Sequence, residues 1–278
     1  MSSKTSLHLV QPPVRELRAD VQTESPESPY LVRADRRSTY SRWTAGEASR
    51  PRVSLIIPAL NEEKSIGAVL RDIPRAWVDE VIVVDNDSMD GTAAIAREAG
   101  AKVVHQPLRG YGAACLKGLA AVQPDSEIIV FLDADYSDFP EEIRILVRPL
   151  FDGSMDLAIG TRTLYPAARV ALSPQQRWGN RLATTLVRLL FGHRYTDLGP
   201  FRAIRRDALD RLGMSDTNYG WTIEMQIKAI KNGLRIVEIP VRYRVRIGGS
   251  KISGTVKGTV LAGSKIIYTI FKYAVRSA

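Results

Sequence analysis

The chain has 278 residues, of which 45% are hydrophobic and 25% are charged. These are ordinary values for a globular protein, so a core of normal size can form. The single cysteine, Cys115, excludes an intrachain disulfide. No uncharged apolar run reaches the roughly 18 residues of a membrane span, and we expect no ordinary transmembrane helix.

The location of the charge is more informative than its total. The net charge is +9, and the segment from Arg235 to the end holds nine Lys or Arg residues but one acid, Glu238. A basic patch of this kind suits phosphates, anionic lipid headgroups or nucleic acid. A solvated surface is the alternative. The lone cysteine suits a reducing compartment, and no secretory apolar region opens the chain, so we expect a cytoplasmic protein.

Three segments differ in character along the chain. Residues 1–50 are rich in Ser, Pro, Arg and Glu without an apolar period, which predicts a disordered or loosely attached tail. Residues 51–253 have the apolar periods of a folded domain, and their rhythm of strands and helices loosens beyond residue 150. Residues 254–278 form the third segment, a basic amphipathic helix.

The first half of the domain alternates short β-branched runs with helical periods. Strands are expected at 53–58, 81–84, 101–105 and 128–132, and helices at 62–73, 91–99 and 113–122. Continuous apolar strands that alternate with helices indicate an α/β fold with a mostly parallel sheet covered on both faces. Beyond residue 150 we expect strands at 156–160 and 234–245 and helices at 175–190, 220–232 and 255–275.

Polar residues follow the predicted strands at one edge of the sheet. The first strand runs into Asn61 and Glu62, the second into 85–87, and the fourth into Asp133 and Asp135. Ligands of parallel sheets bind beyond the carboxyl ends of the strands. Acids gathered there repel one another unless a cation is present. Carboxylate oxygens suit Mg²⁺ or Mn²⁺, and such ions commonly bridge to substrate phosphates.

Six motifs occur in order between residues 53 and 255: 56–63 (IIPALNEE), 83–92 (VVDNDSMDGT), 131–135 (FLDAD) with 140–142 (PEE), 160–162 (GTR), 197–202 (DLGPFR), and Arg246 with Ser250-Lys251. This series resembles family 2 glycosyltransferases, and within them the dolichol- and polyprenyl-phosphate sugar synthases. The resemblance implies a GT-A catalytic domain over residues 51–253, with a Rossmann-like nucleotide-binding half (51–150) joined to an acceptor half (151–253). It also implies an inverting hexosyltransferase that uses a nucleotide sugar.

The resemblance assigns roles to individual residues. It implies donor contacts from Pro58, Leu60, Glu62, Asp85, Asp87 and Asp133. It implies a metal site, for Mg²⁺ or Mn²⁺, at Asp133 and Asp135. Acceptor or phosphate contacts are implied for Arg162, Arg202, Arg246, Ser250 and Lys251. Ser137 stands where many relatives have Gln, which weakens the case for a third side-chain metal ligand.

Two kinds of acceptor have different chemical needs. The cations Arg162, Arg202, Arg246 and Lys251 suit a phosphate, with Arg giving bidentate contacts. A phosphate monoester has a second pKa of about 6 and needs no general base. A hydroxyl acceptor needs one, and Asp197 or Glu224 is the candidate. With Asp135, Arg162 and Arg202, these two acids complete the expected catalytic set.

The expected function is therefore transfer of a hexose from UDP-glucose or GDP-mannose to a polyprenyl or dolichyl phosphate. A soluble or non-phosphate hydroxyl acceptor is one alternative, and a catalytically inactive nucleotide-sugar-binding protein is another. The apolar residues and lysines of the C-terminal helix favour contact with the cytoplasmic face of a membrane, while packing on the domain is the alternative. We expect no nucleic-acid partner, and assembly as a homo-oligomer stays open.

Overall fold

The computed structural model describes residues 50–165, 171–248 and 256–275. The expected tail, apart from Arg50, therefore lies outside the described residues, as do Ser250 and Lys251. The division of the domain into two halves stays a prediction. The strands are β1 (Val53–Ala59), β2 (Glu80–Asp85), β3 (Lys102–His105), β4 (Ile128–Phe131), β5 (Leu157–Thr161), β6 (Arg202–Arg205) and β7 (Ile236–Pro240). The helices are α2 (Ile66–Arg71), α3 (Thr92–Glu98), α4 (Tyr111–Ala121), α5 (Ile143–Phe151), α7 (Pro174–Phe191), α8 (Arg206–Leu212), α9 (Trp221–Lys231) and α10 (Val256–Val275), with a short 3₁₀ turn η1 (Pro140–Glu142) before α5.

The strands form one seven-stranded sheet in the order β3-β2-β1-β4-β6-β5-β7. Strands β1 to β4 pair in parallel, and β5 pairs in parallel with β7. Strand β6 runs antiparallel to both of its neighbours, β4 and β5. The α/β fold with a mixed, mostly parallel sheet is confirmed, and its parallel strands bring their carboxyl ends to one edge.

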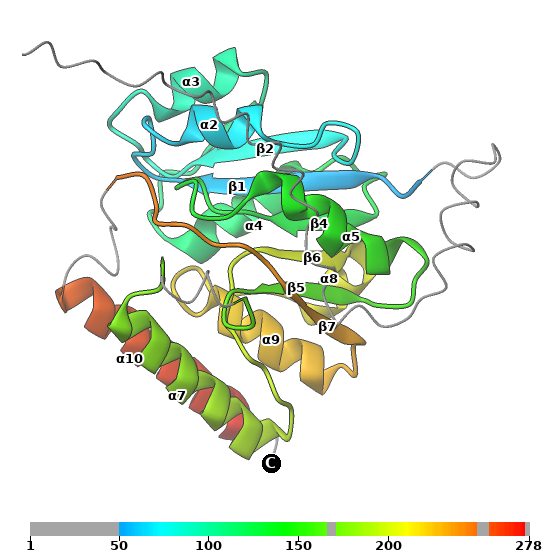
Figure 1. Cartoon of the computed structure of the whole chain (residues 1–278), viewed down its shortest axis with the longest axis vertical. Coiled ribbons are helices and arrows are strands. Elements are labelled where there is room, and N and C mark those ends of the chain that lie inside the picture. Colours follow the sequence, from blue (N-terminus) through cyan, green and yellow to red (C-terminus); the bar gives the residue numbers. More distant parts are fainter. Residues whose placement is uncertain (1–49, 166–170, 249–255, 276–278) are drawn as a thin grey trace, which may run out of the picture. The chain divides into compact units, whose positions relative to one another are not determined.

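Helices cover both faces of this sheet, and each face has its own apolar core (Figure 1). One core joins Leu55, Val83 and Val130 of the strands to α2, α3 and α5. The other joins Ile56, Phe131 and further strand residues to α4, α7, α8, α9 and α10. Alternate strand residues face opposite sides, so the continuous apolar runs of the sequence supply both cores.

Several elements differ from the sequence expectation. The expected helix at 62–73 is limited to Ile66–Arg71, because residues 61–65 form a turn in which Glu62 O accepts bonds from the amides of Ser65 and Ile66. The expected strand at 234–245 ends at Pro240. Strand β6 and helices α5 and α8 were not predicted. Strand β6 has only four residues and is bounded by arginines, which hides it from a search for apolar runs.

Candidate active site

The site lies at the sheet edge where β1, β2, β4 and β5 end. Three residues other than glycine have a positive φ in the described chain, Asn61, Asp87 and Tyr136, and all of them follow these strands. Strained backbone of this kind clusters at functional sites. Beside the first of them is a cavity of about 170 Å³ lined by 61–64, Asp90, Ile247 and Gly248.

Side chains of the first two loops are fixed by hydrogen bonds. Asp85 accepts from the Ser88 amide at 3.1 Å and lies 3.3 Å from His105 Nδ1. Asp87 is more exposed and pairs with Arg109 at 3.0 Å. Asn86, between them, bonds to Gln106 O, Leu108 O and the Gly110 amide, and so shapes the loop before α4. The expected donor residues of this edge, including the half-buried Pro58 and Leu60, are therefore brought together.

Helix α4 begins against a distant loop. A Cβ on Gly112 would collide with the carbonyl oxygen of Asp216, and the Ala113 amide donates to Thr217 O at 2.8 Å. The close approach needs glycine at this position. The Gly110-Tyr111-Gly112 run is thus a packed helix start.

Asp133 and Asp135 follow β4 and differ in their partners. Asp133 Oδ1 is buried and has no hydrogen-bond partner in the structure. Burial and the charge of Asp135 raise the pKa of Asp133 to about 7. Asp135 Oδ1 accepts bonds from the amide and hydroxyl of Ser137, and its Oδ2 lies 3.2 Å from Arg246 Nη1. Ser137 thus supports Asp135.

These two carboxylates fit a divalent ion. Hard oxygen ligands suit Mg²⁺ or Mn²⁺, and an orphaned buried oxygen on Asp133 is a group that such an ion would satisfy. Among the residues that the structure describes, no three His, Cys, Asp or Glu side chains gather into a metal-binding group. A metal at Asp133 and Asp135 would therefore take its other ligands from the donor diphosphate and water.

Arg162 is held rigidly at the end of β5. Its Nε and Nη2 donate to the two oxygens of Asp197, each at 2.8 Å, and its own amide donates to Asp197 Oδ2. The guanidinium also lies over the ring of Tyr243, 5.0 Å from its centroid. Asp197 is fully buried, and Glu238 holds its loop by accepting from the amides of Thr196 and Asp197. Asp197 therefore positions Arg162, whose Nη1 stays outside the pair.

Two expected site residues, Arg202 and Glu224, make contacts in the structure that do not fit their expected roles. Arg202 is completely buried and donates to the carbonyl oxygens of Thr222 and Gly199. It cannot reach a phosphate without leaving both carbonyls, so its expected acceptor contact finds no support.

Glu224 is 1% exposed and accepts bonds from Ser215, Asp216 and Tyr273, with Lys228 Nζ at 2.8 Å. Burial acts to raise the pKa of Glu224, but the bonds from Lys228, Tyr273 and the loop lower it to about 2. A group with so little proton affinity is a poor general base near neutrality, which argues against that expected role.

Asp138 is a site residue that sequence reasoning missed. It is 1% exposed, and neither carboxylate oxygen has a hydrogen-bond partner. Burial, together with the charge of Asp133, raises the pKa of Asp138 well above its usual value. The D-x-D-x-x-D spacing of Asp133, Asp135 and Asp138 was visible in the sequence. That spacing is the signal that could have identified it.

A segment after β7, residues 241–248, closes over this edge, and we call it the closing segment. The amides of Arg244 and Ile247 donate to Ser137 O and Asp135 O at 2.9 and 3.0 Å. Arg244 also lies over the rings of Tyr136 and Phe139. Arg246 donates from Nη2 to Glu62 Oε1 at 3.0 Å. The closing segment thus connects the loops that follow β1 and β4.

Comparisons with known proteins identify the family of the chain. The profile of Glycosyl transferase family 2 matches residues 54–213, more than half of the chain. The chain belongs to glycosyltransferase family 2. An uncharacterised glycosyltransferase of Mycobacterium tuberculosis is 39% identical over 224 residues, which are 78% of this chain and 95% of the relative. The polyprenol monophosphomannose synthase of Mycolicibacterium smegmatis is 33% identical over 73% of this chain and 82% of its own.

A solved structure extends the family likeness to the fold. Glucosyl-3-phosphoglycerate synthase of Mycobacterium tuberculosis, in complex with Mn²⁺, UDP and glucosyl-3-phosphoglycerate, superposes with a TM-score of 0.64. The two chains are 28% identical, and the match covers 81% of this chain and 80% of that one. This neighbour supports the GT-A fold expected from the sequence.

Proposed function

We propose that this glycosyltransferase moves a hexose, with inversion, from a nucleotide sugar to a polyprenyl phosphate. The observation that carries the proposal is the pairing of opposite charges at one sheet edge. Carboxylates Asp133 and Asp135 lie beside the guanidinium groups of Arg162 and Arg246. The carboxylates suit the metal diphosphate of a donor, and the arginines suit the phosphate of an acceptor.

The roles of the residues follow from their contacts. Glu62, Asp85 and Asp87 shape the donor side, with Pro58 and Leu60 at the end of β1. Asp133 and Asp135 would hold Mg²⁺ or Mn²⁺, and the bound ion would neutralise the charge that builds on the leaving diphosphate. Arg162, fixed by Asp197 and Tyr243, presents Nη1 to the acceptor phosphate at low rotational cost. Ser250 and Lys251 extend this acceptor side in the proposal.

The absence of an accessible base among the expected acids supports a phosphate nucleophile. Asp197 is committed to Arg162, and Glu224 is committed to the loop before α9. A phosphate monoester is already ionised and nucleophilic near neutral pH, so neither acid is needed as a base. A lipid phosphate is also named as acceptor chemistry in the polyprenol and dolichyl relatives.

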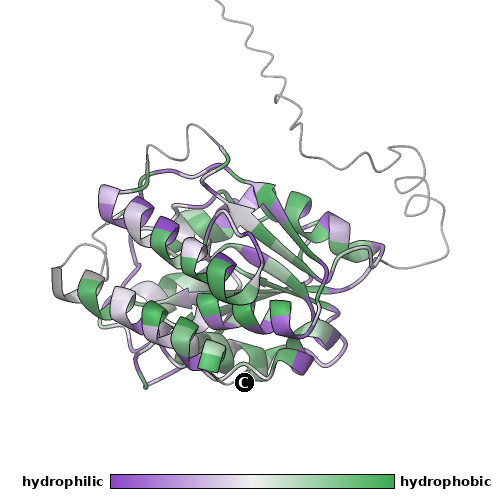
Figure 2. Ribbon diagram, turned by 90° about the horizontal axis from the view of Figure 1, so that it is seen from below, coloured by the Kyte–Doolittle hydropathy of each residue, from purple (hydrophilic) through white to green (hydrophobic). Residues whose placement is uncertain are grey.

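Two helices form a surface suited to a lipid headgroup layer. Helices α7 and α10 pack side by side (Figure 1), and neither contains Asp or Glu. Hydrophobic and hydrophilic residues are mixed on the surface helices of the protein (Figure 2). Exposed apolar side chains lie on both helices, namely Trp178, Leu189, Leu190, Val260, Leu261, Tyr268, Phe271 and Val275. Arg177, Arg181 and Arg188 are exposed on α7. Apolar residues interspersed with cations fit an anionic membrane surface, on which the chain would lie peripherally.

No helix among the described residues has both the length and the apolar composition needed to cross a membrane. Contact with lipid would therefore come from the surface of α7 and α10. Flotation with anionic and neutral vesicles tests it, using Leu261→Asp and Phe271→Asp. These exposed positions are preferable to truncation, because Ile270 and Tyr273 of α10 are buried in the core. Flotation that both substitutions leave unchanged would contradict the membrane surface.

The transfer itself is tested by donor and acceptor together. Purified protein is incubated with Mn²⁺ and labelled UDP-glucose or GDP-mannose, with and without a polyprenyl phosphate. Metal-dependent label in the lipid phase is the expected result, and the donor that supplies it identifies the base and the sugar. Donor hydrolysis without lipid product would reject the lipid acceptor.

A hydroxyl acceptor is the second candidate, and Asp138 is the observation that favours it. Asp138 is an acid of the site with both oxygens unpartnered, so it could take a proton from a hydroxyl once the closing segment moves. The Asp138→Asn variant separates the two candidates. Under the lipid-phosphate proposal transfer falls by less than roughly 10-fold, whereas loss of a base costs roughly 10²- to 10⁴-fold.

A further inference from the structure

In the structure, Arg246 of the closing segment is paired with two acids of the proposed donor site. Arg246 Nη2 bonds to Glu62 at 3.0 Å, and its Nη1 lies 3.2 Å from Asp135. Glu62 is a donor-side residue of the proposed function, and Asp135 is a carboxylate proposed for the metal. One guanidinium thus neutralises two groups that the donor complex would use.

These contacts compete with the donor. Asp135 Oδ1 already accepts two bonds from Ser137, so Oδ2 is the oxygen that remains for a metal, and Arg246 faces it. Two cations cannot both be the close partner of this oxygen without strong repulsion. Entry of the metal diphosphate therefore requires the Arg246 guanidinium to leave Asp135.

The Arg246 side chain can leave Asp135 without movement of its main chain. Arg246 is 27% exposed, and its Nε is buried without a hydrogen-bond partner, so its contacts in this arrangement are incomplete. The main chain on either side is anchored independently of the side chain, by the bonds of Arg244 and Ile247 to residues 137 and 135. The side chain can swing while the closing segment stays in place. A guanidinium binds phosphate well in a bidentate manner.

We infer that Arg246 is an exchangeable counter-ion. It holds Glu62 and Asp135 until the donor complex binds, and it then turns to the acceptor phosphate. This inference rests on the proposed function and deepens it by coupling donor binding to acceptor binding through one side chain. Because linkage is reciprocal, the acceptor must also strengthen donor binding by the same factor.

The test measures binding without turnover. Mn²⁺ alone is titrated into the full chain and followed through the electron paramagnetic resonance signal of the free ion. Arg246→Met keeps much of the side-chain volume and removes the charge, so we expect Mn²⁺ to bind roughly 10-fold more tightly than to the wild type. The matched control is Arg242→Met, whose guanidinium donates to Glu142 and Glu141 and is not paired with Glu62 or Asp135. This control should leave Mn²⁺ affinity within about 2-fold.

A second titration follows the acceptor phosphate. Farnesyl phosphate is added to protein with and without saturating Mn²⁺ and UDP or GDP. In the wild type the nucleotide complex should tighten farnesyl phosphate binding by roughly 10-fold, and Arg246→Met should abolish that gain. Unchanged or weaker Mn²⁺ binding by Arg246→Met would overturn the inference, whatever the transfer assay shows. A wild type that fails to transfer sugar to lipid, yet shows the tighter Mn²⁺ binding of the variant, would instead reject the acceptor and keep the counter-ion.

Discussion

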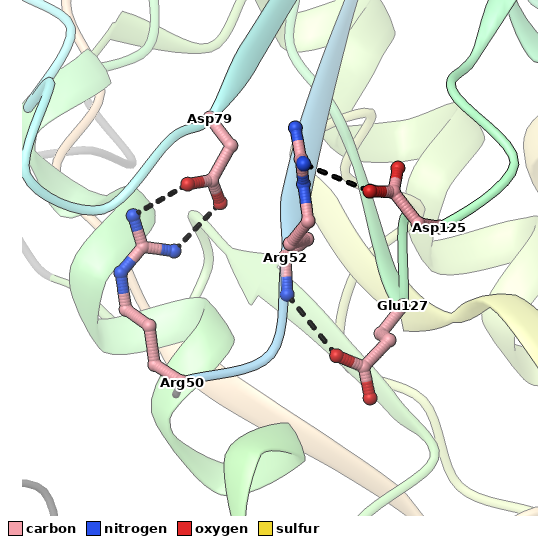
Figure 3. Close-up of a pocket in the computed structure, with 5 residues that line it drawn as sticks. All are labelled: Arg50, Arg52, Asp79, Asp125 and Glu127. Atoms are coloured by element: carbon pink, nitrogen blue, oxygen red, sulfur yellow. Dashed lines mark hydrogen bonds and ion pairs between the residues drawn. The ribbon is translucent and has the colours of Figure 1, made fainter. Parts of the chain in front are cut away.

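The two edges of the sheet handle charge in opposite ways. At the amino ends of β1, β2 and β4, a hollow of about 590 Å³ is lined by Arg50, Arg52, Asp79, Asp125 and Glu127 (Figure 3). Each of its acids accepts a hydrogen bond from an arginine: Asp79 pairs with Arg50, Asp125 with Arg52, and Glu127 with the Arg52 amide. At the carboxyl ends, Asp133 and Asp138 keep buried oxygens without partners.

This difference shows that the volume of a cavity does not identify the functional site. The hollow at the amino edge is the larger of the two. Its acids are paired with arginines and its side chains are exposed, so no group there requires a ligand. The smaller cavity lies beside Glu62, at the edge where Asp133 and Asp138 have buried carboxylate oxygens without hydrogen-bond partners, and buried polar groups without partners are costly unless something binds them. We therefore assign function to the edge that leaves charge uncompensated.

The largest expected effect comes from paired substitutions at the two edges. Asp133→Asn should lower the turnover number by roughly 10³-fold, because a carboxylate that would hold the metal is lost. Asp79→Asn should lower the melting temperature and leave the turnover number within about 2-fold. Steady-state kinetics and thermal unfolding of both variants make the comparison. An Asp133→Asn enzyme with more than a tenth of wild-type turnover would break it.

The next effect concerns the buried ion pair that fixes Arg162. Asp197→Asn leaves a buried guanidinium without its counter-charge and should cost about 3–5 kcal/mol in the free energy of unfolding. The matched control is Asp156→Asn, whose partner Arg235 is 55% exposed, and it should cost about 1 kcal/mol. Urea denaturation measures both. Equal losses would show that burial of the Arg162 pair does not matter.

Glu224 gives a prediction about pH. Its pKa of about 2 lies below the ordinary 4.5, so the ionised group stabilises the folded state above pH 4.5. That contribution, about 3 kcal/mol, is lost as the pH falls from 4.5 toward 2. Glu224→Gln should therefore be less stable than the wild type at pH 7, and the difference should shrink in acid. A constant difference between pH 7 and pH 3 would contradict the assignment.

The strands and the site acids that precede residue 150 could be predicted from the sequence. The first part of the domain, residues 51–150, was predictable because β1, β2 and β4 are continuous apolar runs that end directly in polar residues, and the parallel order follows from the alternation with helices. The placement of Asp133 and Asp135 on a common edge with Glu62 and Asp85 required no more than that. The structure agrees on the elements that position them.

The arrangement of residues 151–253 depends on contacts between distant segments, which a local pattern does not contain. Glu224 was a candidate base, but the bonds that it accepts from Ser215 and Tyr273 of other elements argue against that role. Its motif suggests Arg202 as a phosphate ligand, but Arg202 lies in strand β6 within the core, where its guanidinium donates to carbonyl oxygens. The bond between Arg246 and Glu62 spans 184 positions of the chain, so no spacing could reveal it.

Asp138 should show the opposite sign from Glu224. Its pKa is raised by burial, so the folded state holds a proton that the unfolded chain releases, and the wild type loses stability as the pH rises above about 4. Asp138→Asn removes this penalty and should stabilise the fold by roughly 1–2 kcal/mol at pH 7. The gain should grow from pH 4 to pH 7 in chemical denaturation. A destabilised Asp138→Asn variant would show that the carboxylate has partners in solution.

The smallest effect is expected at the amino edge, and it is the strictest check of the comparison. Arg52 and Asp125 are 2.8 Å apart, but their side chains are 48% and 59% exposed, so solvent screens the pair. A double-mutant cycle with Arg52→Ala and Asp125→Ala should give a coupling of about 0.5 kcal/mol, with transfer activity unchanged. A coupling above about 2 kcal/mol would place this pair outside the range of exposed ion pairs. Loss of transfer activity in either variant would contradict the comparison itself. It would mean that paired charges at the amino edge also bind a ligand, and that unpaired charge does not identify the functional site.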